Sequence, residues 1–184
     1  TLAEAARLWN QPGYARDARM LLAAIESQEV SEVPEFGTML LPGASGFMRE
    51  GGLHWQFNPS YLPVPLLRRL TALSPRGPRG RNAENTATLV QRAVGAHGLA
   101  PDWIVYAMDA EGTWAFSAHP EKGSIGSYDA IRTYLWAGMT PRADPLAAPL
   151  MQSLQGLAAI LARTGALPAS VNTANGEAKG AAPF

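Results

Sequence analysis

Apolar residues recur at helical spacing along much of the chain. Residues 2–9 and 14–30 each place apolar side chains three or four positions apart, a pattern typical of amphipathic helices. Gln, Pro and Gly at 11–13 lie between them and predict a break. Because this connection is short, we expect the two helices to form an antiparallel pair.

The same periodicity predicts four further helices. One is expected to open at Asn58, a suitable N-cap followed by proline, with its regular part after two more prolines. Residues 85–97 form the next, and Ser127 can cap a third. An Asp-Pro step predicts the start of the last helix, over residues 144–164.

Three stretches lack helical spacing. Residues 34–56 combine Gly, Pro and short apolar runs, so we expect an irregular or hairpin-like excursion there. Residues 101–106 and 113–116 flank a polar turn and predict a small β-hairpin. The tail at 171–184 is rich in Ala, Gly and Asn and is expected to be irregular.

These elements together favour an all-α fold. Six helices paired in antiparallel hairpins, with two β-like excursions on their connections, are typical of a toroid of helix pairs. In such a toroid the polar and aromatic helix starts at Asn58 and Ser127 can meet at one end. We therefore expect a shared cleft there, and the chemistry within it.

Charge and composition exclude several function classes. The 184 residues suit one domain, and 47% apolar content can fill a sizeable core. Fifteen basic and fifteen acidic residues cancel, so no field attracts nucleic acid or an acidic membrane surface. The basic segment at 74–81 is interpreted as a solvated connection. No apolar run is long enough to predict membrane insertion.

Metal and cofactor chemistry is not indicated. The chain has no Cys, and its three His residues are scattered, so neither a disulfide framework nor a His-based metal site is expected. We predict no cofactor. The chain opens at Thr1 already in a helical pattern, and for this reason we expect it to be an internal piece of something longer.

One stretch, residues 127–136, carries the strongest candidate chemistry. Asp129 falls in the first helical turn, where backbone N–H groups favour an anion. Arg132 and Trp136 follow three and seven positions later, so carboxylate, guanidinium and indole share one side of the helix. This side suits a polar ligand with a flat apolar face. The alternative is an ordinary capped helix with an ion pair.

Four motifs occur in a fixed order along the chain. They are Thr38-Met39-Leu40-Leu41-Pro42-Gly43, Phe57-Asn58-Pro59-Ser60-Tyr61-Leu62-Pro63, Ala100-Pro101-Asp102-Trp103 and Ser127-Tyr128-Asp129-Ala130-Ile131-Arg132-Thr133-Tyr134-Leu135-Trp136-Ala137-Gly138-Met139. Together they resemble the glycoside hydrolase family 8 endoglucanases associated with bacterial cellulose synthase. The resemblance covers nearly the whole chain, residues 1–184, as the C-terminal part of a single catalytic domain.

The resemblance implies a fold and an activity. It implies an (α/α)6 barrel, about half of which this chain supplies, and a periplasmic or secreted setting. It also implies hydrolysis of β-1,4-glucan, such as cellulose, with inversion at the anomeric carbon. A role in bacterial cellulose biosynthesis follows, and a cellulose synthase complex is a candidate partner.

The resemblance also implies roles for individual residues. Asp129 matches the general base that activates the attacking water, and Arg132 matches the arginine beside it. Tyr61 matches the tyrosine that helps to hold the water, and Tyr128 an aromatic residue of the cleft. Physical chemistry agrees, because a cation near Asp129 favours the charged form that a base requires.

Further residues near these motifs are candidates for substrate binding. Trp55, Phe57 and Trp136 could stack on sugar rings, whose flat C–H faces pack on aromatic faces. A place in the core is the default interpretation for each of them. Asn58 could contact substrate, although its capping role explains it equally well.

The proton donor is not evident in this sequence. An inverting glycosidase needs a second carboxyl group about 6.5–9.5 Å from the base. In the family this is a glutamate in a Glu-Gly-x-Ser-Tyr-Gly type motif near the beginning of the mature domain, and the chain lacks that motif. We therefore expect the acid to lie upstream and the isolated chain to be inactive.

Two other functions compete with hydrolysis. A non-catalytic glucan-binding toroid module would keep the aromatic residues but would tolerate loss of Asp129. A glycan lyase acting on an anionic uronate would need a basic cleft, which the neutral charge balance disfavours. Retention of the Asp-x-x-Arg pattern favours a hydrolase.

Overall fold

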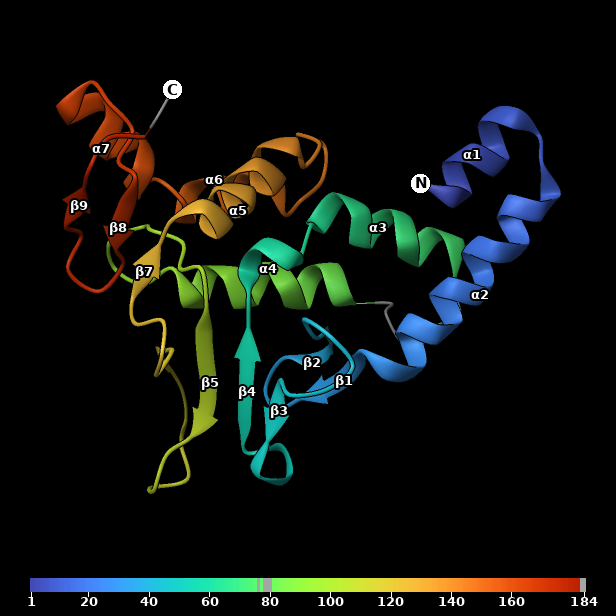
Figure 1. Ribbon diagram of the computed structural model, residues 1–184, viewed down its shortest axis with the longest axis horizontal. Coiled ribbons are helices and arrows are strands. Elements are labelled where there is room, and N and C mark those ends of the chain that lie inside the picture. Colours follow the sequence, from blue (N-terminus) through green and yellow to red (C-terminus); the bar gives the residue numbers. More distant parts are fainter. Residues whose placement is uncertain (76, 78–80, 183–184) are drawn as a thin grey trace.

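The structure, a computed structural model, describes residues 1–75, 77 and 81–182. Four residues of the predicted basic connection at 74–81 lie outside the described residues, as do the last two residues of the tail. The described chain is elongated, with the N-terminal helices at one end and the C-terminal segment at the other (Figure 1).

Helices α1 (Leu2–Trp9) and α2 (Pro12–Gln28) form the N-terminal pair. Asn10 adopts a left-handed conformation (φ 50°) that ends α1, and Pro12 opens α2 at a position where a missing N–H does no harm. The two helices pack on each other through Trp9 and Tyr14, whose ring centroids are 5.8 Å apart. The predicted pair and the break between its helices are confirmed.

Four helices pack together in the middle of the molecule (Figure 1). They are α3 (Val64–Leu73), α4 (Asn82–Ala93), α5 (Tyr128–Met139) and α6 (Ala147–Ser153). Their shared core contains Leu67, Val90, Ala130, Ala137 and Leu150, all of them buried. This core positions α5, which carries the candidate chemistry.

The helix predicted over residues 144–164 is divided into α6 and α7 (Gly156–Thr164). The division falls where the Gly156 N–H donates a hydrogen bond to the Gly98 carbonyl at 2.9 Å. A side chain at Gly156 would begin 2.2 Å from the His97 carbonyl oxygen. The Gly156 N–H therefore bonds to Gly98 in place of a carbonyl within its own helix, and the helix is interrupted. The local sequence pattern does not reveal this contact, because Gly98 is remote in the chain.

The excursions predicted at 34–56 and 101–116 form more β-structure than expected. Strands β1 (Val30–Val33) and β2 (Gly37–Leu40) pair as a hairpin. A separate antiparallel sheet has the order β3-β4-β5-β6. Its strands are β3 (Met48–Arg49), β4 (His54–Phe57), β5 (Ile104–Met108) and β6 (Trp114–Ala118). The predicted β-hairpin is confirmed as β5–β6, and it is extended by strands from far upstream.

The C-terminal tail is more ordered than predicted. Strands β7 (Ile125–Gly126), β8 (Ser170–Asn172) and β9 (Ala178–Lys179) form a third sheet. The expectation of an irregular tail is therefore wrong for β8 and β9. The reason is that β8 pairs with β7, which lies next to α5 and is remote in sequence.

The all-α prediction requires correction. Within the described ranges the chain forms seven α-helices together with three small sheets, and those helices do not close into a barrel (Figure 1). Two short 3₁₀ turns, η1 (Glu50–Gly52) and η2 (Pro59–Tyr61), flank β4. Across the same described residues, no helix is both long and apolar enough to cross a membrane.

Candidate active site

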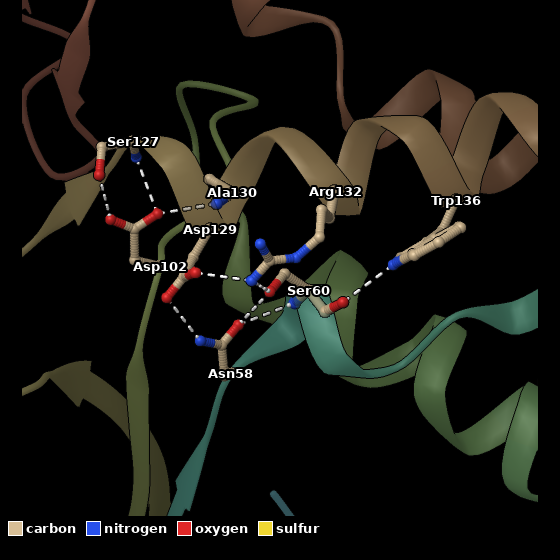
Figure 2. Close-up of polar contacts among 8 residues, drawn as sticks. All are labelled: Asn58, Ser60, Asp102, Ser127, Asp129, Ala130, Arg132 and Trp136. Carbon is tan, nitrogen blue, oxygen red and sulfur yellow. Dashed lines mark hydrogen bonds and ion pairs between the residues drawn. The ribbon is translucent and has the colours of Figure 1, made fainter.

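Asp102 caps the helix that carries the site. The first N–H groups of a helix lack intrahelical acceptors, and here Asp102 Oδ1 accepts from the N–H groups of Ser127 and Ala130, both at 2.8 Å. Asp102 Oδ2 accepts from the Ser127 hydroxyl at 2.5 Å (Figure 2). Ser127 is at the predicted N-cap position, but the capping carboxylate belongs to Asp102, just before β5.

Asp129 has its two carboxylate oxygens held by different partners. Arg132 Nη2 donates to Oδ1 at 2.6 Å, and Asn58 Nδ2 donates to Oδ2 at 2.9 Å (Figure 2). The Asp129 side chain nevertheless stays 31% exposed. Because an ionised carboxylate has about four lone-pair sites, it can still accept a hydrogen bond from a water molecule at its open side.

A closed ring of hydrogen bonds joins α5 to η2. Asn58 Oδ1 accepts from the Ser60 N–H at 3.0 Å and from the Ser60 hydroxyl at 2.6 Å. The Ser60 hydroxyl in turn accepts from Arg132 Nη2 at 3.0 Å, which returns the ring to Asp129. Trp136 Nε1 adds a bond to the Ser60 carbonyl at 2.8 Å. A satisfied network of this kind fixes the carboxylate in one orientation.

The two tyrosines predicted to belong to the site are open to solvent. Tyr61 ends η2, and the guanidinium carbon of Arg132 lies 5.7 Å from the centre of its ring, within the range of a cation–π contact. Tyr128 directly precedes Asp129 and is 66% exposed. Tyr61 therefore lies beside Arg132 and Tyr128 is open to solvent next to Asp129 in the chain, and the contacts of both with substrate stay predictions.

Trp55 and Phe57 are not sugar-stacking platforms. Trp55 is 4% exposed and Phe57 is fully buried, both within the core that includes β4, β5 and α4. Trp55 also uses its N–H, which donates to the Gly52 carbonyl at 2.9 Å. Side chains alternate between the faces of a strand, and these two belong to the core face of β4. The prediction of substrate contact is wrong for both.

Asn58 acts on Asp129 rather than on substrate. It is buried, and its amide is occupied by Ser60 on one side and Asp129 on the other. The predicted capping role is confirmed, because Asn58 Oδ1 accepts from the Ser60 N–H at the start of η2. The predicted substrate contact is corrected, since burial leaves no face of the amide for a sugar.

Side-chain hydrogen bonds of Tyr134 and Arg68 connect α5 and the neighbouring helices to other parts of the chain. The Tyr134 hydroxyl accepts from the Ala100 N–H at 2.9 Å, and burial raises the pKa of this tyrosine. Arg68 on α3 donates to both oxygens of Asp144, at 2.9 and 3.1 Å. These hydrogen bonds from Arg68 hold the pKa of Asp144 below its usual value. Tyr134 thus ties α5 to the segment before β5, and Arg68 ties α3 to the connection between α5 and α6.

Asp102 and Ser60 are the site residues that sequence reasoning missed. Asp102 lies in the Ala-Pro-Asp-Trp motif, and Ser60 in the Asn-Pro-Ser-Tyr motif, so both were inside recognised segments. The available signal was their residue type, because Asp and Ser commonly satisfy helix termini and turns. Their partners lie 25 and 72 residues away, a distance that local spacing does not reach.

The described residues contain no group of three or more His, Cys, Asp or Glu placed to hold a metal ion. The chemistry available at α5 is instead that of one oriented carboxylate, one guanidinium and exposed tyrosines. Such a set can accept a proton from a water molecule and can pack against a neutral ligand with flat apolar faces.

Comparison with known proteins places this site in a family of glycosidases. Residues 1–183 match the glycosyl hydrolases family 8, and the chain belongs to that family. The chain is 43% identical over 182 residues to an endoglucanase of Xanthomonas axonopodis pv. citri, with 99% of this chain and 45% of the relative covered. An endoglucanase of Pseudomonas fluorescens is 44% identical over 179 residues, with coverages of 96% and 45%.

A solved structure shows the same arrangement. The endo-1,4-D-glucanase from Vibrio fischeri superimposes with a TM-score of 0.88 at 34% identity, and the match covers 98% of this chain and 50% of that one. The chain thus spans about half the length of the relatives that it matches.

Proposed function

We propose that this chain supplies the general-base half of an endo-β-1,4-glucanase. The observation that carries the proposal is the ring around Asp129, in which Arg132 and Asn58 hold one carboxylate oxygen each. This geometry supports a base that is fixed in direction yet open to water. Membership of family 8 and the endoglucanase relatives support the substrate class.

In the proposed reaction Asp129 accepts a proton from the attacking water. The water oxygen forms a bond to the anomeric carbon as the glycosidic bond breaks, and a carboxylic acid on the opposite face gives its proton to the leaving oxygen. Attack opposite the leaving group inverts the β-linkage to an α-anomer. We propose that the Tyr61 hydroxyl helps to orient this water and that Tyr128 contacts the sugar.

Asp102 is not the missing acid in this scheme. Both of its oxygens accept hydrogen bonds from the start of α5, through Ser127 and Ala130, so it serves as the cap. We therefore propose that the donor is a glutamate outside these 184 residues. This agrees with the share of the relatives that the chain covers.

We also propose the architecture and setting of the complete protein. The family and the match to the Vibrio fischeri structure support an (α/α)6 barrel, of which this chain forms about half. The motif resemblance to endoglucanases of bacterial cellulose synthase systems supports a periplasmic or secreted setting. It also supports cellulose chains as substrate, a role in cellulose biosynthesis and a synthase complex as a partner.

The test is the stereochemistry of hydrolysis by the full-length protein. Cellohexaose is digested in an NMR tube, and the first reducing ends are read before they mutarotate. We expect the α-anomer to appear first, together with a rapid fall in viscosity of a soluble cellulose ether that marks attack within chains. A first product in the β-configuration would contradict inversion, and intact cellohexaose would contradict the proposed activity itself.

A further inference from the structure

Ser60 lies between the two side chains that hold Asp129 (Figure 2). Its hydroxyl accepts a hydrogen bond from Arg132 Nη2 at 3.0 Å and donates one to Asn58 Oδ1 at 2.6 Å. Arg132 belongs to α5, whereas Asn58 directly precedes η2 and is remote in the sequence. The Ser60 hydroxyl therefore links two donors that come from separate elements of the fold.

The chemistry of the ring determines the direction of each of its hydrogen bonds. A guanidinium can only donate, so the Ser60 hydroxyl accepts from Arg132 and gives its own proton to Asn58. Asn58 Oδ1 also accepts from the Ser60 N–H at 3.0 Å, so this side of the amide faces two donors. The amide nitrogen of Asn58 is thus turned towards Asp129, where it donates to Oδ2 at 2.9 Å.

Arg132 shares its hydrogen bonds between Asp129 and Ser60. Arginine and carboxylate groups frequently pair through two parallel hydrogen bonds, one to each oxygen. Here Nη2 donates one proton to Asp129 Oδ1 at 2.6 Å and the other to the Ser60 hydroxyl, and Oδ2 is left to Asn58. The Arg132 side chain is 41% exposed, so packing alone does not fix it. Its position depends on these hydrogen bonds.

This division of Asp129 between two donors leaves a place for water on each oxygen. An ionised carboxylate has about four lone-pair sites, and each oxygen of Asp129 accepts one hydrogen bond from the ring. Without the Ser60 hydroxyl, the second proton of Nη2 would lose its acceptor, and the exposed guanidinium would be free to turn onto both oxygens. It would then compete with Asn58 for Oδ2 and change the direction of the carboxylate.

We propose that Ser60 is a positioning residue for hydrolysis, because its hydroxyl keeps Arg132 on one oxygen of Asp129 and Asn58 on the other. The inference rests on the proposed function, in which Asp129 is the general base. Ser60 is 2% exposed, so it acts through Asp129 and does not touch the glucan. Its loss should therefore slow the cleavage of bound substrate without weakening substrate binding.

The test compares two buried hydroxyl groups in the full-length protein. Ser60→Ala removes the hydroxyl of the ring, and Thr86→Val removes one that donates to Asn82 Oδ1 at 3.3 Å on α4. The Thr86 hydrogen bond has the same chemistry and is buried, but it lies outside the ring. We expect Ser60→Ala to lower kcat on cellohexaose roughly ten- to hundredfold at unchanged KM, as for a misplaced reacting group. Thr86→Val should leave both constants unchanged.

A double-mutant cycle with Arg132→Lys tests whether Ser60 acts through Arg132. A lysine ammonium is a point charge without the planar fork of arginine. On the Arg132→Lys background, Ser60→Ala should therefore change kcat by less than about twofold. If Ser60→Ala does not fold, Ser60→Cys replaces it on both backgrounds, since a thiol is only a weak donor.

Three results would overturn the positioning role of Ser60. They are an unchanged kcat in the folded Ser60 variant, an equal loss of kcat in Thr86→Val, and an equal loss with and without Arg132→Lys. Each of them, with an active wild type and an inactive Asp129→Asn variant, would leave the proposed function standing. A wild type that leaves cellohexaose intact would instead contradict the proposed function.

Discussion

Two regions of the molecule differ in how completely their side chains are packed. One, here called the corner, is the ring of hydrogen bonds around Asp129, and the other, the arm, is the helix pair α1 and α2. At the corner, every side chain of the ring from Asp129 to Asn58 has a partner within this chain. On the arm, four large apolar side chains are more than half exposed: Leu8, Trp9, Met20 and Leu21. An apolar hollow also separates the arm from α3.

The contrast shows that the orientation of the Asp129 carboxylate and the burial of the apolar faces of the arm are separate properties. The orientation of Asp129 depends on contacts from Asn58, Arg132 and Asp102, all of which the chain provides. The exposed apolar side chains of the arm lack partners within the described residues, and large exposed apolar surfaces mark interaction sites. We propose that the rest of the glycosidase domain covers the arm.

The largest expected effect, on both activity and stability, is that of studying these 184 residues without the rest of the proposed domain. The 184 residues alone should show no measurable cellulose hydrolysis and a broad, weakly cooperative thermal transition. A large apolar side chain left in water forfeits roughly 1.5–3 kcal/mol, against a total margin of about 5–15 kcal/mol. Calorimetry and a reducing-end assay check this, with the full-length protein as the control.

Coexpression of the proposed remainder of the domain sharpens the same comparison. It should restore both a sharp transition and activity, because under the proposal it supplies the apolar partners and the proton donor. A monomeric isolated chain that melts sharply and cleaves cellulose would show that the arm needs no cover. The acid would then have to be found among the carboxylates of this chain.

A smaller effect is expected at the cap of α5. Asp102→Ala leaves two N–H groups and the Ser127 hydroxyl without their acceptor, and should lower stability by about 0.5–2 kcal/mol. Because Asp129 is in the same helical turn, kcat should fall roughly ten- to hundredfold with little change in KM. Asp102→Asn should recover part of this loss.

Asp109→Ala is the matched control for the cap. Asp109 also accepts two backbone N–H groups, from Glu111 and Thr113, but in the β5–β6 turn. Its loss should reduce stability without changing kcat. Equal kcat losses in the Asp102 and Asp109 variants would mean that Asp102 supports the fold in general and has no particular effect on Asp129.

The smallest expected effect on turnover is at Asp144, where only the pH dependence of stability should change. Hydrogen bonds from Arg68 depress the pKa of Asp144 in the folded protein, so the stabilisation is present above the unfolded pKa of about 3.9 and is lost as the pH falls through the lower folded value. Asp144→Asn should therefore destabilise by about 1–3 kcal/mol at pH 7 and by much less near pH 2.

Urea unfolding at the two pH values measures this difference. Asp17→Asn is a suitable control, because Asp17 is exposed and its contact with Arg16 is long, at 3.6 Å. An equal effect of Asp144→Asn at both pH values would show that its contribution does not depend on ionisation.

Local spacing explains what the sequence could predict about the site. The Asp129 and Arg132 pair has an i,i+3 spacing, so helical periodicity alone brings the two together. Asn58 meets Asp129 across 71 residues, and no local pattern encodes that contact. Its capping role was visible because it involves Ser60, two residues away.

For the fold, as for the site, local features could be predicted from the sequence and long-range contacts could not. Helices α1 and α2 follow from local periodicity, whereas β4 pairs with β5 across a helical segment, so the sheet could not be anticipated from either strand. Trp55 and Phe57 were misjudged for this reason. The pairing decides which face of β4 is buried.

The most direct test of the central claim is the turnover of Asp129→Asn in the full-length protein. The amide is similar in size, and its oxygen can still accept a hydrogen bond from either Arg132 or Asn58, each of which donates to one oxygen of Asp129, but it cannot take a proton from water. We predict that hydrolysis of a soluble cellulose ether falls by at least about 10²-fold, while glucan binding by affinity electrophoresis stays within roughly twofold of wild type. Retention of more than about a tenth of wild-type turnover would contradict the assignment of Asp129 as the general base.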